Sequence, residues 1–589
     1  MRRTPCLLPP PTPLKAPLHP TPSRHTMSST FALSLLALAT LFLVLVVRAI
    51  HLLFFHPLSS IPGPWYAAVS SLWITTHVLR LQQCKTIHAL FQTYGPVVRI
   101  APNKIAFCDL SAMKSVYSTC KFDKSDYYKS LLTNDNDHAM TTLPHAQHSI
   151  RRKAYAAHYM PSNLAKLQPE ICDATGQMID TLHNLPSNTA LDTLSLFRHL
   201  ALDIIVASSY GFRLGAVGKW AVEAEEGLTV AIGDFPKRGI LRSAVPKWAW
   251  NLVCKIPNAR LRLLCDSDKI MAEFVSTRVY EMRAKMAAAQ KLPEPTPTVL
   301  VAPTPLAFLS GFCSRSSSRS PSPCPSEDSS LADDTEKSYL LPRLLAYKYN
   351  GQTMPEKDVI SECMGHMVAG TDTTSISLSF FLWELTRRRD ILHKLRSEID
   401  AVMLDAKTIP DIKILNGMDY LNAFIKEGLR IYGAAPSLLE RVVPGSAPSN
   451  KHFFGADGFD LLGYALPPGT IVATQAWSMH RDPAVFPSPE TFLPERWLTS
   501  PTEDPVAEEA RLARMASYMM PFGTGSRICG GLNLAHLTMR VILVAVLRNF
   551  EIEAAPGTDE KSMDMRDSFV MFPAAMECKL IFHPRAASL

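Results

Sequence analysis

The sequence predicts a mainly helical protein with minor β-sheet and one membrane-spanning helix near its N-terminus. Two observations carry this prediction. Apolar residues recur at spacings of three and four through most of residues 145–290 and again beyond residue 339, which is the period of an amphipathic helix. Residues 31–47 are uncharged and almost wholly apolar, and as a helix they would be about 26 Å long, close to the thickness of a bilayer core.

The apolar N-terminal stretch is interpreted as an uncleaved anchor. A cleaved signal peptide is the alternative, but the stretch is long for one and no clear cleavage site follows. The prolines Pro57, Pro62 and Pro64 end the helix and redirect the chain. We therefore expect residues 27–56 to form a single-pass membrane anchor and residues 57–589 to form one domain.

Two segments have compositions that cannot build a core. Residues 1–26 are basic and rich in proline, and residues 293–338 are rich in proline and serine. We expect the first to be a disordered extension and Met27 to be the working start. We expect the second to be a disordered insertion, either natural or from a mistranslated intron.

Charge and cysteine content exclude several classes of protein. The net charge is +7 without a long Lys/Arg run, so nucleic-acid binding is not indicated. The 12 cysteines are scattered and include no CxxC pair, so neither a zinc site nor a disulfide scaffold is indicated. Most of them are expected to be buried thiols.

Several elements are predicted for the domain. A long helix is expected from Thr353 to about Arg388, because Thr353 and Glu356 fit a capping box with Pro355 in the first turn. A turn at residues 94–96 leads into a short strand, and short strands and turns are expected up to about residue 483. Further helices are expected at residues 191–210, 267–289, 421–432 and 532–550.

Residues 522–531, F-G-T-G-S-R-I-C-G-G, carry the strongest functional signal. They fit the pattern F-x-x-G-x-R-x-C-x-G through Phe522, Gly525, Arg527, Cys529 and Gly531. Glycines allow positive φ and a close approach of backbone amides to a ligand. A Cys in such a loop before a helix is favoured as a thiolate by the dipole and by nearby N–H groups. A glycine-rich turn around a buried Cys is the alternative interpretation.

This segment resembles the haem-binding loop of the cytochrome P-450 family. The resemblance implies a cytochrome P-450 fold, mainly α with minor β-sheets, and a haem b (heme b) group whose iron is bound by Cys529. It also implies that Phe522, Gly525 and Arg527 contact the haem, with Arg527 pairing with a propionate. A thiolate ligand favours O–O cleavage of iron-bound O2.

Residues 369–374, A-G-T-D-T-T, lie midway along the predicted long helix and resemble the family's distal-helix motif. Gly370 leaves room for O2 beside the helix. The resemblance implies that Asp372 and Thr373 are the catalytic acid and alcohol that relay protons to oxygen. A helix face with a cluster of threonines is the alternative.

The sequence also resembles the family in a buried ion-pair triad. Glu427-x-x-Arg430 places opposite charges one turn apart on a helix, and Arg496 follows in a P-E-R-W segment where the family usually has Phe instead of Trp497. The resemblance implies that Glu427, Arg430 and Arg496 form a structural triad behind the haem. Unpaired charges there would be costly.

Arg152 and Arg441 are two further expected haem-propionate contacts. Arg152 belongs to His148-x-x-x-Arg152, which resembles the family's W-x-x-x-R helix with His in place of Trp; Arg441 precedes a short strand. A solvated surface charge is the alternative for each. By resemblance the substrate would be contacted by mainly apolar segments, which suggests an apolar substrate. They are residues 127–144, the helix near Met367, residues 435–439 and residues 569–572.

The resemblance implies a monooxygenase that hydroxylates or epoxidises an apolar substrate with O2. No flavin- or nicotinamide-binding segment is recognisable, so electrons are expected from NADPH through a separate NADPH–cytochrome P-450 reductase. The sequence resembles fungal microsomal members, which implies a single-pass endoplasmic reticulum protein of secondary metabolism with a cytosolic catalytic domain. The alternatives are a haem-thiolate isomerase or dehydratase, against which Asp372 and Thr373 argue, and a non-catalytic haem-binding protein.

We predict that deleting residues 293–338 leaves haem incorporation intact, because their composition offers nothing to bury in the domain. The measurement is the haem content of the purified deletion variant against that of the full chain. Limited proteolysis of the full chain is expected to cut first inside this segment. Loss of haem on deletion would contradict the prediction.

Overall fold

The computed structural model describes residues 24–186, 188–223, 227–291, 339–445, 454–455 and 458–585. The predicted insertion at residues 293–338 lies outside them, as does most of the predicted extension. The chain divides into two units, residues 1–59 and residues 60–589. The first unit contains the helix α1 (Arg24–Ile50), which begins ahead of the predicted anchor, and the short π-helix η1 (His51–Phe55).

Two described helices are long and apolar enough to cross a membrane. The most apolar 18-residue window of Phe31–Phe55 has no buried residue, as expected of a lipid-facing helix, whereas Leu532–Asn549 is mostly buried inside the second unit. The second helix is therefore a core helix. The helix at the N-terminus ends before Pro57, where the sequence predicted that it would.

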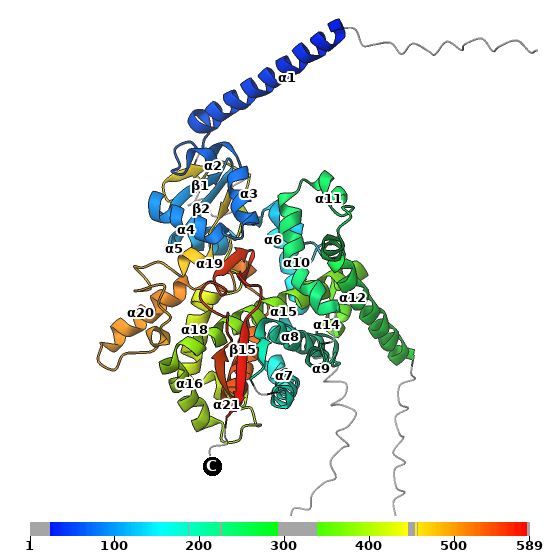
Figure 1. The fold of residues 1–589 in the computed structure, drawn as a ribbon, viewed down its shortest axis with the longest axis vertical. Coiled ribbons are helices and arrows are strands. Elements are labelled where there is room, and N and C mark those ends of the chain that lie inside the picture. The colour runs from blue at the N-terminus through cyan, green and yellow to red at the C-terminus, as the bar shows by residue number, and fades with distance from the viewer. Residues whose placement is uncertain are drawn as a thin grey trace, which may run out of the picture. The chain divides into compact units, whose positions relative to one another are not determined.

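Helices dominate the second unit (Figure 1), so the predicted mainly helical fold with minor β-sheet is confirmed. The α-helices are α2 (Trp65–Val69), α3 (Leu72–Leu79), α4 (Gln83–Tyr94), α5 (Leu110–Met113), α6 (His145–Ala156), α7 (Pro161–Asn184), α8 (Thr193–Tyr210), α9 (Ala216–Ala221), α10 (Gly227–Ala244), α11 (Lys247–Val253), α12 (Ala259–Lys291), α14 (Leu340–Ala346), α15 (Glu356–Arg387), α16 (Arg389–Val402), α17 (Ile412–Asn416), α18 (Asp419–Tyr432), α19 (Ala476–Met479), α20 (Pro505–Tyr518) and α21 (Leu532–Asn549). Shorter π and 3-10 helices are η2 (Lys114–Thr119), η3 (Asp126–Leu131), η4 (Ala157–Tyr159), η6 (Pro494–Trp497) and η7 (Gly525–Arg527).

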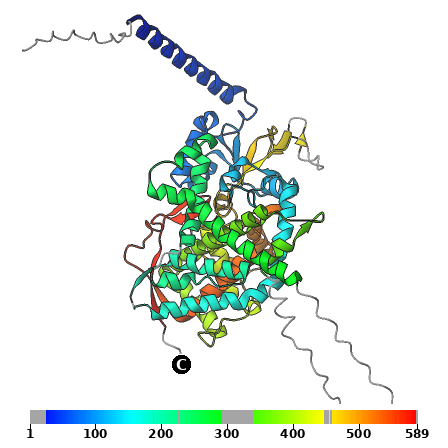
Figure 2. The same ribbon diagram turned by 90° about the vertical axis from the view of Figure 1, so that its right-hand side faces the viewer.

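The strands form small separate sheets. A five-stranded sheet has the order β1 (Val97–Ala101), β2 (Lys104–Phe107), β11 (Ile471–Ala473), β7 (Arg441–Val442) and β3 (Asp123–Lys124). Two three-stranded sheets have the orders β10 (Tyr464–Leu466), β9 (Gly458–Leu461), β8 (Phe454–Gly455), and β12 (Phe550–Ala554), β15 (Lys579–Pro584), β4 (Ala190–Asp192). Two hairpins pair β13 (Met565–Ser568) with β14 (Val570–Pro573) and β5 (Lys348–Tyr349) with β6 (Gln352–Thr353). In Figure 2 the hairpin of β9 and β10, in yellow, projects from the body of the unit.

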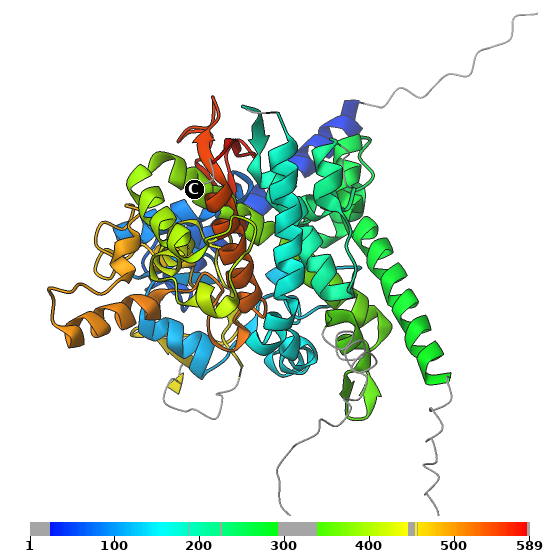
Figure 3. The ribbon, with the colours of Figure 1, turned by 90° about the horizontal axis from the view of Figure 1, so that it is seen from below.

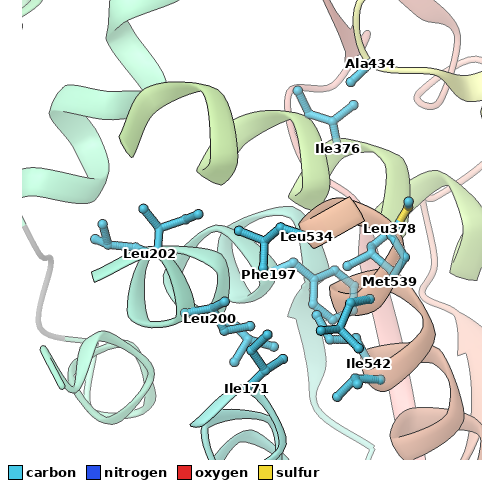
Figure 4. Packing of buried hydrophobic residues seen from close by; sticks show 14 of the residues in the cluster. Ile171, Phe197, Leu200, Leu202, Ile376, Leu378, Ala434, Leu534, Met539 and Ile542 are labelled. Carbon is cyan, nitrogen blue, oxygen red and sulfur yellow. The ribbon is translucent and has the colours of Figure 1, made fainter. Parts of the chain in front are cut away.

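The hydrophobic core lies where four helices meet. α8 and α15 are buried on nearly all sides and pack against each other, and α12 runs along the outside of the helical part (Figure 3). The four helices are α7, α8, α15 and α21. Figure 4 shows buried side chains from each of them: Ile171 of α7; Phe197, Leu200 and Leu202 of α8; Ile376 and Leu378 of α15; and Leu534, Met539 and Ile542 of α21. Apolar burial of this extent fixes α15 through the middle of the unit.

The long predicted helix is confirmed as α15, but its predicted capping box is wrong. The helix begins at Glu356 with Pro355 at its N-cap position, and no side chain caps it. Thr353 instead pairs with Lys348 in the hairpin of β5 and β6. A residue in a strand cannot have its hydroxyl on the first turn of the helix, so the tertiary hairpin overrides the local signal.

Buried ion pairs join α18 to the segment that contains η6. Glu427 accepts hydrogen bonds from Arg430 Nε at 2.9 Å and from Arg496 Nε at 3.0 Å, and all three side chains are buried. Trp497 Nε1 donates to the second carboxylate oxygen of Glu427 at 3.0 Å, and the Leu493 N–H donates at 2.9 Å. The carboxylate is thus surrounded by donors, as a buried charge requires.

We predict that Glu427→Gln lowers the free energy of unfolding by about 3–5 kcal/mol, because it leaves two buried guanidinium groups without a counter-charge. The measurement is equilibrium chemical denaturation. Glu495→Gln is the matched control, since Glu495 pairs with the largely exposed Lys394 and should cost about 1 kcal/mol or less. Equal losses in the two variants would contradict the role of the buried triad.

Candidate functional site

The cysteine loop runs from Pro521 to Gly531 and ends at the first turn of α21. The Cys529 N–H donates to the Phe522 carbonyl at 2.8 Å and closes the loop on itself. Gly525 has a φ of +67°, and a Cβ atom there would lie 2.2 Å from the Tyr117 carbonyl oxygen. Only glycine fits this position, because any side chain would clash with the backbone of η2.

The Cys529 side chain opens into an internal cavity, where it is accessible although the domain encloses it. Burial raises the pKa of its thiol, while N–H groups of Gly531 and Leu532 and the charge of Arg152 lower it. The N–H groups and the arginine thus favour the thiolate, and the thiolate is the form of cysteine that binds a metal. A further positive charge at the sulfur, such as a metal ion, would complete this stabilisation.

The cavity has a volume of about 340 Å³ and a mainly apolar lining. The cysteine loop contributes Phe522, Arg527 and Cys529, and the middle of α15 contributes residues 368–370 and 372–374. The predicted proximal and distal motifs, far apart in the sequence, therefore face one cavity. Other predicted lining segments contribute Tyr128, Leu131, Ala139 and Met140, then Ala435 and Leu439, then Phe569 and Val570. Met367 is instead buried in the core, and the neighbouring Val368 lines the cavity.

Four cations line the same cavity. They are Lys124, Arg152, Arg441 and Arg527, and none of them forms an ion pair with a carboxylate in the described part of the chain. Pairing of β3 with β7 sets Lys124 opposite Arg441. Burial and the charges of Arg441 and Arg527 lower the pKa of Lys124 well below its usual range.

Burial and the Arg441 charge also lower the pKa of Arg527, to about 10. A buried cluster of unpaired cations is costly without anions. Its position beside an accessible cysteine fits a group that carries both a metal and carboxylates, as haem does with its two propionates. The residues present therefore fit the implied cofactor.

The two arginines nearest the cysteine also hold the loop. Arg527 donates to the carbonyls of Thr142 and Leu143 at 2.7 and 2.6 Å, and Arg152 of α6 donates to the Ile528 carbonyl. The Nε of Arg527 is buried and has no partner among the described residues, and its Nη1 and Nη2 each keep a second N–H, so donors remain for the predicted propionate contact.

His148, which stands where the resembling pattern has Trp, is buried on α6 and lines the cavity. Burial, followed by the charges of Arg527 and Lys124, lowers its pKa to about 2. The imidazole is therefore neutral at physiological pH, and it can donate one hydrogen bond to an anion without adding a charge.

Asp372 and Thr373 both line the cavity but are bonded differently. Thr373 Oγ1 donates to the Ala369 carbonyl one turn back at 2.7 Å. Asp372 Oδ1 accepts from Arg198 Nε of α8 at 2.7 Å, and the carboxylate is buried. Its Oδ2 is buried and has no hydrogen-bond partner within the described ranges.

Three charged residues of the site were missed by the sequence reasoning. They are Lys124 in the cation cluster, Arg198 beside Asp372, and Glu362, which lines the cavity. Glu362 pairs with Arg151 at 3.1 Å and accepts from the Ala139 N–H at 3.1 Å. Burial raises the pKa of Glu362 to about 7, with Arg151 opposing. None of these residues belongs to a local motif, so the sequence gave no signal for them.

The sequence matches the cytochrome P-450 family over residues 60–229 and 323–580. It is 27% identical over 544 residues to the cytochrome P-450 monooxygenase orf2 of Aspergillus niger, covering 91% of this chain and 93% of that protein. It is also 27% identical to the monooxygenase stcB of Emericella nidulans, covering 89% and 88%, and to BOT1 of Botryotinia fuckeliana, covering 85% and 86%. With the fold and the cysteine loop, these matches establish that the chain is a haem monooxygenase of the cytochrome P-450 family.

Proposed function

We propose that Cys529 is the thiolate ligand of haem b and that the enzyme hydroxylates or epoxidises an apolar organic substrate. The observation that carries this proposal is the accessible Cys529 in a cavity that is also lined by four unpaired cations and by the Asp372–Thr373 segment. The N–H groups of Gly531 and Leu532 offset part of the burial that raises the pKa of the Cys529 thiol. The fungal relatives support a role in secondary metabolism.

The cations would hold the two propionates of a haem and so orient it. Arg441 and Lys124 lie opposite each other on paired strands, while Arg152 and Arg527 approach from α6 and from the cysteine loop. Charge-assisted hydrogen bonds from two directions fix both the position and the tilt of a planar group. The neutral His148 adds a donor.

When bound, the haem supplies O2 activation, placing one oxygen atom in the substrate and releasing the other as water. The chain's own residues move the protons for this reaction. Thr373 Oγ1 donates to the Ala369 carbonyl, which orients the hydroxyl so that its oxygen can accept a hydrogen bond from a water in the cavity. Asp372 keeps Oδ1 on Arg198 and exchanges protons through Oδ2.

Electrons and location complete the proposal. The two electrons are supplied by NADPH through a separate membrane-bound cytochrome P-450 reductase. The apolar, exposed Phe31–Phe55 helix supports single-pass anchoring in the endoplasmic reticulum, with the catalytic domain in the cytosol. The mainly apolar lining of the cavity favours an apolar substrate.

We predict that Cys529→Ala abolishes the red-shifted Soret band of the reduced CO complex, because the thiolate donor raises electron density on the iron. The measurement is the reduced-CO difference spectrum of the purified variant. Cys172→Ala is the matched control, since this partly buried cysteine lies on α7 and does not line the cavity. Retention of the band in Cys529→Ala, or its loss in Cys172→Ala, would refute the ligand assignment.

We predict that Thr373→Ala preserves the CO spectrum but uncouples the reaction, because Thr373 is the proposed hydroxyl for proton delivery to oxygen. The ratio of product to NADPH consumed should fall by roughly 10-fold, less than the full acid–base contribution of about 10²–10⁴-fold because water can replace part of the hydroxyl's role. Released hydrogen peroxide should rise in parallel. Thr371→Ala is the control, since Thr371 lies on the same helix but is fully buried and does not line the cavity. Unchanged coupling in Thr373→Ala would remove the support for its catalytic role.

A further inference from the structure

A tyrosine–histidine pair lies at the cavity wall and has no part in the chemistry above. The Tyr159 hydroxyl of η4 is 2.9 Å from Nδ1 of His366 on α15. Both residues line the cavity, and Tyr159 is 6% exposed. Nε2 of His366 is buried without a partner in the described part of the chain.

The pair lies beside the proposed iron ligand. A Cβ atom built on Gly531 would lie 3.8 Å from Cε1 of Tyr159 and 4.0 Å from the Cys529 sulfur, so ring and sulfur are both within about 4 Å of one point. The ring centroids of Tyr159 and His366 are 5.4 Å apart, and Tyr155 lies 4.6 Å from His366. The phenol is therefore close enough to the proposed cofactor for direct electron exchange.

Burial keeps the pair uncharged at rest. It raises the pKa of Tyr159 well above its usual range and lowers that of His366 to about 3. The phenol retains its proton, and the neutral imidazole can accept the hydrogen bond at Nδ1. Neither group is an effective acid or base for turnover near neutral pH, because neither changes its charge there. A phenol hydrogen-bonded to an imidazole can still lose an electron and a proton together.

We propose that Tyr159 is a redox-active residue that reduces the oxidised haem centre when no substrate is consumed, with His366 as its proton acceptor. This rests on Cys529 holding the haem, as proposed above. Reduction of a peroxide to two waters takes two electrons and two protons from the protein and solvent. Tyr159 supplies one electron and the haem supplies the other. The Tyr159 O–H bond breaks, an N–H bond forms on His366 Nδ1, and a neutral phenoxyl radical remains.

The proton on His366 need not travel far, because Nδ1 already holds the hydrogen bond from the Tyr159 hydroxyl at 2.9 Å. A thiol reductant can then return the electron while His366 returns the proton. Such a cycle would remove oxidising equivalents that otherwise damage the haem or the cavity wall.

The test uses the full-length, haem-loaded protein without substrate. It is mixed with hydrogen peroxide, freeze-quenched and examined by electron paramagnetic resonance. We expect a tyrosyl radical in the wild type, most of which disappears in Tyr159→Phe. Tyr155→Phe is the matched control, since this neighbouring tyrosine contacts the His366 ring without a hydrogen bond to it, and it should retain the signal. Bleaching of the Soret band by peroxide should be several-fold faster in Tyr159→Phe than in Tyr155→Phe.

The other outcomes are decisive as well. With a normal reduced-CO band, an absent wild-type radical or an unchanged signal in Tyr159→Phe overturns the proposal while the Cys529 assignment stands. Absence of that band in the wild type overturns the Cys529 assignment and this inference with it. If Tyr159→Phe fails to incorporate haem, His366→Leu decides. A large loss of radical there supports the pair, and an unchanged signal overturns it.

Discussion

The proposed function depends on a Cys529 sulfur that can carry a negative charge inside a folded domain. Burial opposes this charge, so the loop must supply donors and nearby cations to offset the lost hydration. The N–H groups of Gly531 and Leu532 do so only if the chain reaches α21 through a tight turn. That turn requires Gly525 against the Tyr117 carbonyl, which leaves no room for a side chain. Gly525 is therefore needed for the same reason as the N–H donors, which is to offset the burial of the sulfur.

The cost of burying a charge also distinguishes the charges that stabilise the fold from those available to bind a ligand. Around Glu427 the charges are paired, because each guanidinium of the triad has the Glu427 carboxylate as its partner. Around the cavity the cations Lys124, Arg441 and Arg527 have none within the described residues, and burial leaves His148 neutral. A folded domain tolerates such an imbalance where a bound anion restores it. The unpaired cluster is therefore stronger evidence for a carboxylate-bearing cofactor than any single arginine is.

The sequence could predict the features encoded locally. The cysteine loop, the motif around Asp372 and the pairing of Glu427 with Arg430 are short patterns whose spacing reflects one turn or one helix. The predictions that were wrong or missing concern contacts between elements far apart in the sequence. Arg198 reaches Asp372 across a helix interface, and Thr353 is drawn into a hairpin instead of capping α15. The indole of Trp497 is an intermediate case, since the substitution is visible in sequence but its hydrogen bond to Glu427 is not.

The packing of α8 on α15 gives Gly370 a second role besides leaving room for O2. A Cβ atom at Gly370 would lie 2.3 Å from Cδ1 of Ile205, so the absence of a side chain lets α8 approach α15 closely. Arg198 lies two turns before Ile205 on the same helix and bonds Asp372, the second residue after this glycine. A larger residue at position 370 would require the end of the Ile205 side chain to move, and any shift of α8 would carry Arg198 away from Asp372. The small residue of the motif thus also fixes the ion pair that orients the proposed proton donor, which explains why the acid and the glycine belong to one short segment.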